Sequence, residues 1–154
     1  MNIFELVESN NLIGVEMLLD SESGGADVNK RTDDRWKQTP LMLASRKGLM
    51  DMAKLLVSKG AKIHQKCAFG GTPIYYAACD NQPEAIEFLI QNGAKVNHKC
   101  CNGNTPIMAA CIDGLNCEAI MMLLKYGARP SIRNDDGLNT NKRYLMSRIA
   151  SKLN

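Results

Sequence analysis

Apolar residues fall into short stretches along the chain, each long enough for about two turns of helix, with polar residues between them. Three of these stretches follow the same pair, Thr-Pro, which begins at Thr39, Thr72 and Thr105. Threonine is a good N-cap and proline suits the first helical position, so each pair predicts a helix start. A second apolar stretch follows each of the three, "MAKLLV", "AIEFLI" and "AIMMLL", and predicts a second helix.

These paired stretches are an internal repeat. Thr-Pro recurs at a constant interval, and Gly-Ala ends the second stretch at Gly60, Gly93 and Gly127, where glycine commonly ends a helix in the left-handed conformation. A small residue recurs at one place in each first helix, as Ala44, Ala77 and Ala110. The residues between Gly-Ala and the next Thr-Pro are rich in glycine, asparagine and lysine and predict a hairpin-like loop. One such unit buries its apolar face only by stacking on its neighbours.

The pattern resembles the ankyrin repeat, whose core reads approximately G-x-T-P-L-H-x-A-A-x-x-G-H, then V-x-x-L-L and G-A-D-V-N. Matching stretches are "TPLMLASRKG", "GGTPIYYAACDN", "NGNTPIMAACIDG" and "GADVN". The resemblance implies an all-α ankyrin-repeat solenoid of stacked helix-turn-helix units with projecting β-hairpin-like loops. It divides one domain, 1–154, into an N-terminal capping repeat and long loop (1–33), full repeats (34–66, 67–99, 100–133) and a C-terminal capping helix (134–154).

The N-terminal and C-terminal segments differ from the full repeats, as the capping units of a solenoid do. Asn2 and Glu5 have the spacing of a capping box, and "NKRYLMSRIASKLN" predicts an amphipathic C-terminal helix. The first loop is longer than the later ones, since Gly25 stands farther before its Thr-Pro than Gly60 stands before the next. Met1 and the two caps lead us to expect a complete chain. We also expect a monomer.

The composition argues against several functional classes. The net charge of +3 is too small to indicate a nucleic-acid partner, and without an apolar run long enough to cross a bilayer we expect no membrane partner. The N-terminus has no basic segment typical of a secretory signal. Six cysteines without such a signal suggest thiols in a reducing compartment, so we expect the cytoplasm, with the nucleus as the alternative.

Neither a catalytic motif nor a cofactor motif is found, so we expect no enzyme, no cofactor and no catalytic residue. His64 with Cys67, or His98 with Cys100, would be the local pair for nucleophilic catalysis, with solvated loop histidines as the alternative. The candidate ligands for zinc are in the same adjacent loops: His64, Cys67, His98, Cys100 and Cys101. Equivalent positions of adjacent repeats lie about 8–10 Å apart, too far to share one ion without deforming the loops. We therefore predict no metal site.

The resemblance implies that a protein partner binds at the loop tips and on the concave face of the first helices. The residues at those positions are Arg35, Trp36, Gln38, Arg46, Lys47, Phe69, Asp80, Asn102, Asn104, Asp113 and Asp136. Trp36 and Phe69 fall at equivalent loop positions beside basic residues, a composition typical of an interface hot spot; packing of Trp36 on the next loop is the alternative. The basic residues lie toward the N-terminus and the aspartates toward the C-terminus, which predicts a charge gradient along this face.

These features favour a non-catalytic protein-interaction module or adaptor with a partner of unknown identity. Direct inhibition of an enzyme such as a kinase is one alternative, and a redox- or metal-sensing ankyrin scaffold is another. The resemblance also implies hydroxylation of Asn29 and Asn97 by an asparaginyl hydroxylase; the alternative is that each asparagine only bonds across its loop.

Overall fold

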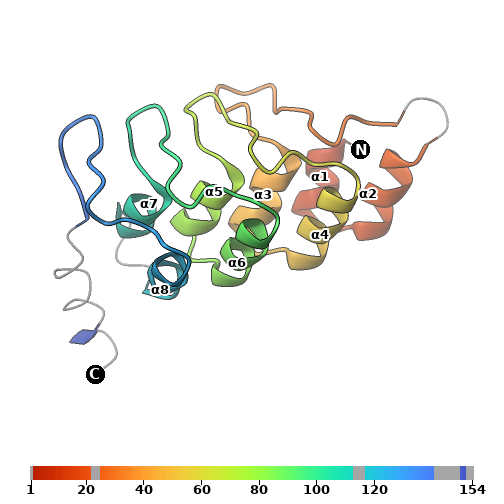
Figure 1. Cartoon of the computed structure of the whole chain (residues 1–154). Coiled ribbons are helices and arrows are strands. Elements are labelled where there is room, and N and C mark those ends of the chain that lie inside the picture. Colours follow the sequence, from red (N-terminus) through yellow and green to blue (C-terminus); the bar gives the residue numbers. More distant parts are fainter. Residues whose placement is uncertain (1, 22–24, 113–116, 141–149, 152–154) are drawn as a thin grey trace.

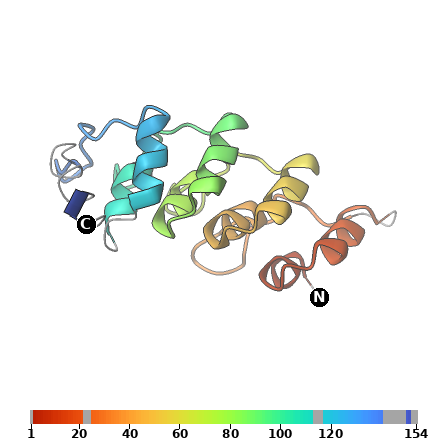
Figure 2. The same ribbon diagram turned by 90° about the horizontal axis from the view of Figure 1, so that it is seen from below.

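The chain folds into a row of helix pairs with loops projecting from one side (Figure 1). This computed structural model describes residues 2–21, 25–112, 117–140 and 150–151. Within these residues it has eight helices and no strand, which confirms the all-α prediction. They are α1 (Ile3–Glu8), α2 (Leu12–Leu19), α3 (Pro40–Lys47), α4 (Met50–Ser58), α5 (Pro73–Cys79), α6 (Pro83–Gln91), α7 (Pro106–Ile112) and α8 (Cys117–Lys125). Figure 2 shows the pairs side by side along the solenoid.

The helices begin and end where the repeat predicts. Pro40 and Pro73 start their helices, and the Asn2–Glu5 capping box opens α1. The turn between paired helices needs a left-handed residue, which is supplied by Gly48 (φ 67°) or by asparagine, as at Asn81 (φ 53°). The glycines of Gly-Ala also have positive φ after α4, α6 and α8, as expected for helix C-termini.

Both helices of each pair contribute buried side chains to the core. The repeated alanines Ala44, Ala77 and Ala110 are fully buried in the first helices of their pairs, α3, α5 and α7. Leucines of the second helices, such as Leu56 and Leu89, are equally inaccessible and cover them. The first helices therefore pack in an unbroken row, in which α5 contacts both α3 and α7.

Met42 and Met108 stand where the family pattern has the histidine of Thr-Pro-Leu-His, and each accepts a local hydrogen bond. The Thr39 N–H donates to the Met42 sulfur at 3.4 Å, and the Thr105 N–H donates to Met108 at 3.5 Å. A thioether is a weak acceptor. The hydroxyls of Thr72 and Thr105 are buried and find no partner among the described residues. The helix starts thus tolerate weaker local bonding because neighbouring repeats pack around them.

The loops have the hairpin-like bonding that their composition predicts. In the second loop (residues 61–72) the Cys67 N–H donates to the Gly71 carbonyl, and Cys100 bonds in the same way to Asn104 in the third loop (residues 94–105). Successive tips are also joined: the Ala68 N–H donates to the Trp36 carbonyl at 2.9 Å. The loops therefore form one connected row, although no part of them is a strand within the described residues.

Two asparagines join neighbouring repeats at the bases of the loops. The Asn29 amide donates to the Gly60 carbonyl at 3.2 Å, and its oxygen accepts from the Lys62 N–H at 2.8 Å. Asn97 makes the same pair of bonds to Gly127 and Arg129, at 3.1 and 2.8 Å. The sequence suggested that each asparagine bonds across its own loop, but these bonds run to the base of the next loop; hydroxylation stays a prediction.

We expect Asn97→Ala to lower the free energy of unfolding by about 1 kcal/mol, because it removes both inter-repeat hydrogen bonds at a site partly open to water. Chemical denaturation measures this change. Asn92→Ala is a suitable control, since the Asn92 amide bonds to Phe88, within its own helix turn. An equal loss in both variants would show that the bridge contributes nothing beyond local structure.

Candidate functional site: a groove beneath the first loop

The first loop (residues 25–39) owes its shape to one carboxylate. Its extra length lies at the tip, where the Thr32 N–H reaches across to the Gln38 carbonyl. Asp34 Oδ1 accepts hydrogen bonds from the Thr32 hydroxyl at 2.7 Å, the Trp36 N–H at 2.9 Å and the Lys37 N–H at 3.1 Å. The Thr32 bond is the largest of the effects that lower the pKa of Asp34. The carboxylate therefore fixes the backbone that presents Trp36.

Trp36 and Phe69 form the aromatic pair expected from their equivalent positions. Their ring centroids are 5.0 Å apart with the planes tilted by 52°, and the two residues remain 42% and 44% exposed. The Arg35 guanidinium lies 4.9 Å from the Trp36 centroid. Packing and partner contact were alternatives for Trp36 in the sequence. The pair shows that Trp36 does pack on the next loop, while much of its surface stays available.

A groove of about 500 Å³ lies between the first loop and the first helices. We call it the concave groove. It is lined by Phe4 and Glu8 of α1, Leu43 and Arg46 of α3, Tyr76 and Cys79 of α5, Asp80, and Thr32, Asp34, Trp36 and Gln38 of the first loop. Four of the predicted partner-binding residues thus share one cavity: Trp36, Gln38, Arg46 and Asp80.

The charges in this groove differ from the predicted gradient. The Arg46 Nε atom lies 3.8 Å from Asp80 Oδ2, with the two side chains 37% and 49% exposed. The sequence placed Arg46 toward the positive end of the gradient and Asp80 toward the negative end. In the structure they are neighbours, because equivalent positions of adjacent repeats lie side by side in the stack. Such an exposed pair contributes about 0–1 kcal/mol to stability. Glu8 and Asp34 add two further carboxylates to the lining, so acidic groups outnumber the single guanidinium.

The other predicted residues lie outside this groove. Lys47 is exposed at the end of α3, and Asn102 is exposed at the tip of the third loop. Asn104 accepts a hydrogen bond from the Asn134 amide at 2.9 Å and lines a separate cavity of about 300 Å³. Asp136 is exposed in the loop that follows α8. Asp113 and the predicted C-terminal helix lie outside the described residues, apart from two helical residues at 150–151.

Sequence reasoning missed Glu8, although a signal for it exists. Asn10, Gly48 and Asn81 all have positive φ and mark the same turn in three repeats. Counting back two residues from each gives Glu8, Arg46 and Cys79, and all three line the groove. Aligning the degenerate first repeat by its turn, rather than by its missing Thr-Pro, would have found Glu8.

Lowering the pH should destabilise the folded conformation of the first loop. Because the folded-state pKa of Asp34 is lowered, its contribution to loop stability is present above the unfolded pKa, near 4, and is lost as the pH falls through the folded value. Trp36 is the single tryptophan, so its fluorescence reports on this loop. We expect Asp34→Ala at pH 7 to show the fluorescence of the acidified loop. Asp33→Ala is the control, and an identical change in that variant would contradict the assignment to Asp34.

Comparison with known proteins places the chain among repeat proteins of this architecture. The sequence matches the family described as "Ankyrin repeats (3 copies)" over residues 3–100 and 62–134. The chain belongs to the ankyrin-repeat family. It is also 34% identical over 76 residues to the mouse (Mus musculus) 2-5A-dependent ribonuclease, a match that covers 49% of this chain and 10% of that protein.

Ankyrin repeats are generally protein–protein interaction modules and are typically non-catalytic. Among the described residues, no three histidine, cysteine or acidic side chains are grouped so as to hold a metal ion. Across the same part of the chain, each helix is too short or too polar to cross a membrane.

Proposed function

We propose that this ankyrin-repeat protein is a non-catalytic interaction module or adaptor, and that a partner protein binds in the concave groove. The observation that carries the proposal is the exposed Trp36–Phe69 pair, because Trp36 also lines the cavity together with Gln38, Arg46 and Asp80. Large aromatic side chains and arginine are enriched in interface hot spots. The loop bonds hold the pair in place, which limits the entropy that binding costs.

The groove favours a basic segment of the partner over an acidic one. Glu8, Asp34 and Asp80 line it against one guanidinium, and Asp80 already lies beside that guanidinium. A lysine or arginine of the partner could pair with Glu8, and an apolar side chain of the partner could pack on the exposed part of the Trp36–Phe69 pair. We therefore propose a partner segment that combines an apolar anchor with at least one cationic residue.

Affinity capture from native cells tests this proposal. Wild-type protein should recover a partner that Glu8→Lys recovers poorly, because the charge reversal repels a basic segment. Glu84→Lys makes the same change on α6, where Glu84 is exposed and does not line the groove. Equal recovery by all three proteins would place the interface elsewhere, and recovery of no partner by the wild type would argue against an interaction module.

Two narrower functions stay predictions with less support. Direct inhibition of an enzyme such as a kinase would use the same groove, and a kinase panel assayed at micromolar protein concentration tests it.

A redox sensor would need reactive thiols. Burial raises the pKa of the Cys111 thiol to about 11, which suppresses its thiolate, and no disulfide joins the six cysteines, all of which are described. The cytoplasmic or nuclear location and the monomeric state stay predictions as well.

A further inference from the structure

The middle repeat lacks the asparagine bridge that joins the loop bases on either side of it. Asn29 and Asn97 stand four residues after Gly25 and Gly93, and His64 stands four after Gly60. The corresponding partners of His64 would be the Gly93 carbonyl and the Lys95 N–H. An imidazole cannot copy the geometry of the amide, and His64 makes no hydrogen bond to either residue within the described structure. The His64 imidazole therefore stands where the flanking loops have a bridging amide, and it does not join the two loop bases.

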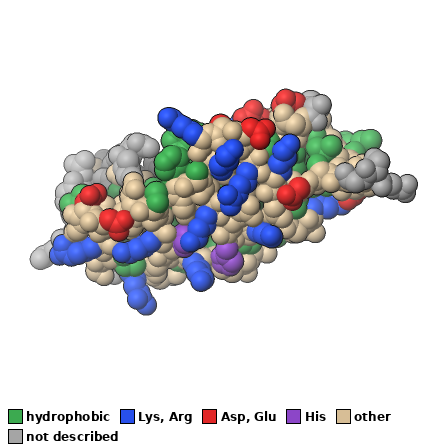
Figure 3. Space-filling view, turned by 90° about the horizontal axis from the view of Figure 1, so that it is seen from above, with side chains coloured by type: hydrophobic (Ala, Val, Ile, Leu, Met, Phe, Trp, Pro, Cys, Tyr) green, Lys and Arg blue, Asp and Glu red, His purple; other side chains and the backbone are tan. Residues whose placement is uncertain are grey.

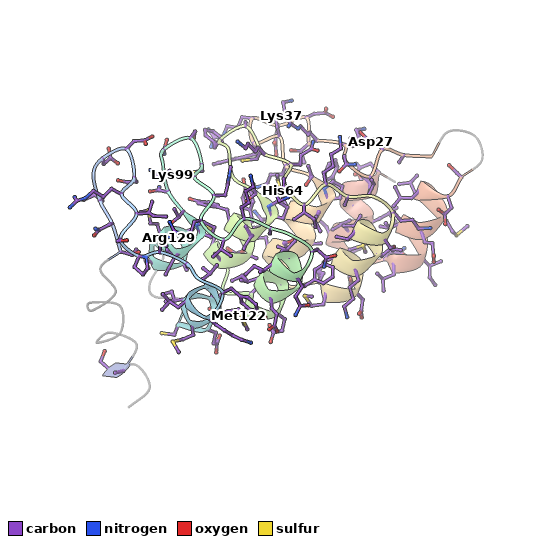
Figure 4. All side chains as sticks on the ribbon, in the orientation of Figure 1. Asp27, Lys37, His64, Lys99, Met122 and Arg129 are labelled. Atoms are coloured by element: carbon purple, nitrogen blue, oxygen red, sulfur yellow. The ribbon has the colours of Figure 1, made fainter. Side chains whose placement is uncertain are left out.

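A pocket of about 220 Å³ occupies this place and shares no lining residue with the concave groove. We call it the histidine pocket. It is lined by Ile63, His64, Lys66, Thr72, Ile74, Ala94, Lys95 and His98. Figure 4 labels His64 beside the loop bases, and Figure 3 shows both histidines in purple among blue lysine and arginine side chains.

Every ionisable side chain of this lining is basic. Two lysines and two histidines face it, from two neighbouring loops, and no carboxylate does. The hydroxyl of Thr72 adds a further polar atom: the residue is 4% exposed, and the hydroxyl has no partner in the described structure. The equivalent hydroxyl of Thr105 is also buried and unpaired, so this feature belongs to the repeat and is not specific to the pocket.

The pKa of His98 is affected by burial and by the basic groups of the pocket. Its Nε2 lies 3.2 Å from the Gly70 carbonyl, which fixes the ring at the junction of the two loops. Burial is the largest cause that lowers the pKa of His98, and Lys66, Lys95 and His64 lower it further, against the opposing effect of Gly70. An anion bound among these groups would offset both lysines and raise the pKa again.

We propose that the histidine pocket binds a phosphate group, held by Lys66, Lys95 and the two histidines. The volume is below the 300–1,000 Å³ that is usual for drug-sized ligands, so it suits one compact anion and leaves the rest of the ligand outside. A tetrahedral phosphate accepts hydrogen bonds from several directions, and the lining offers basic side chains from both loops. This site is separate from the concave groove and does not depend on a protein partner there.

Titration of the whole chain with pyrophosphate, followed by calorimetry and by NMR of the His98 ring, tests the proposal. We expect saturable binding, a raised pKa of His98 in the complex, and a dissociation constant about tenfold higher in Lys66→Gln and Lys95→Gln. Lys54→Gln is the matched control, because Lys54 is an exposed lysine of α4 that pairs with Asp51. Vesicles of phosphatidylcholine with phosphatidic acid distinguish a lipid phosphate from a free one.

His64→Asn is the sharpest variant, since it restores the residue found in the flanking loops. We expect it to raise the thermal unfolding temperature without ligand and to abolish pyrophosphate binding, because the new amide bridges Gly93 and Lys95. Binding that is absent in the wild type, or weakened equally by Lys54→Gln, would overturn the proposal as an adventitious ion only. Unchanged affinity in both pocket lysine variants would overturn it as well.

Discussion

Replacing Trp36 with alanine should weaken binding of the captured partner by about 2 kcal/mol or more, the usual threshold for a hot spot. This corresponds to a roughly 30-fold higher dissociation constant. The indole supplies one wall of the concave groove, and its contact with Phe69, at 5.0 Å between centroids, holds both rings in the orientation that a partner would meet. The remaining Phe69 would lose that support as well. Calorimetry or surface plasmon resonance with the purified partner measures the change.

The same substitution should barely change folding stability. Trp36 is 42% exposed, and its backbone bonds to Asp34 and Ala68 do not depend on the ring. Met121→Ala is the matched control, because Met121 is a large apolar residue of similar exposure, 48%, on the outer helix α8. If Trp36→Ala lowers stability markedly and leaves affinity unchanged, Trp36 is a packing residue and the proposed binding site is misplaced.

The fold could be predicted from the sequence because its determinants are local and repeated. Thr-Pro caps, left-handed glycines and buried alanines each act within one repeat, and stacking at a fixed step then follows. Even the substitution of glycine by Asn81 left the turn intact, since asparagine tolerates positive φ. Because the period is constant, the same helix starts and ends recur in each repeat, and an ambiguous boundary in one repeat can be read from its neighbours.

The candidate site could be predicted only in part, because it depends on differences between the repeats. Trp36 and Phe69 were found as equivalent positions, and they do pair. The neighbourhood of Arg46 and Asp80 was not found, since charges counted along the chain say nothing of which side chains adjoin across the stack. The histidine pocket lies where one repeat has His64 in place of the bridging asparagine, a difference that gains meaning only when the flanking bridges are seen.

Replacing Ala77 with leucine should have the largest effect on folding that we expect from one added side chain. Ala77 is fully buried in α5, which contacts α3 on one side and α7 on the other, so the added atoms meet packed helices in both directions. Overpacking of this kind costs about 1–3 kcal/mol, or about 2–4 °C of unfolding temperature for each kcal/mol in a chain of this size. Ala68→Leu adds the same atoms at an exposed position of the second loop and serves as the control. Thermal and chemical denaturation should separate the two variants clearly, while equal stability would mean that the repeated alanine does not set the spacing of the first helices.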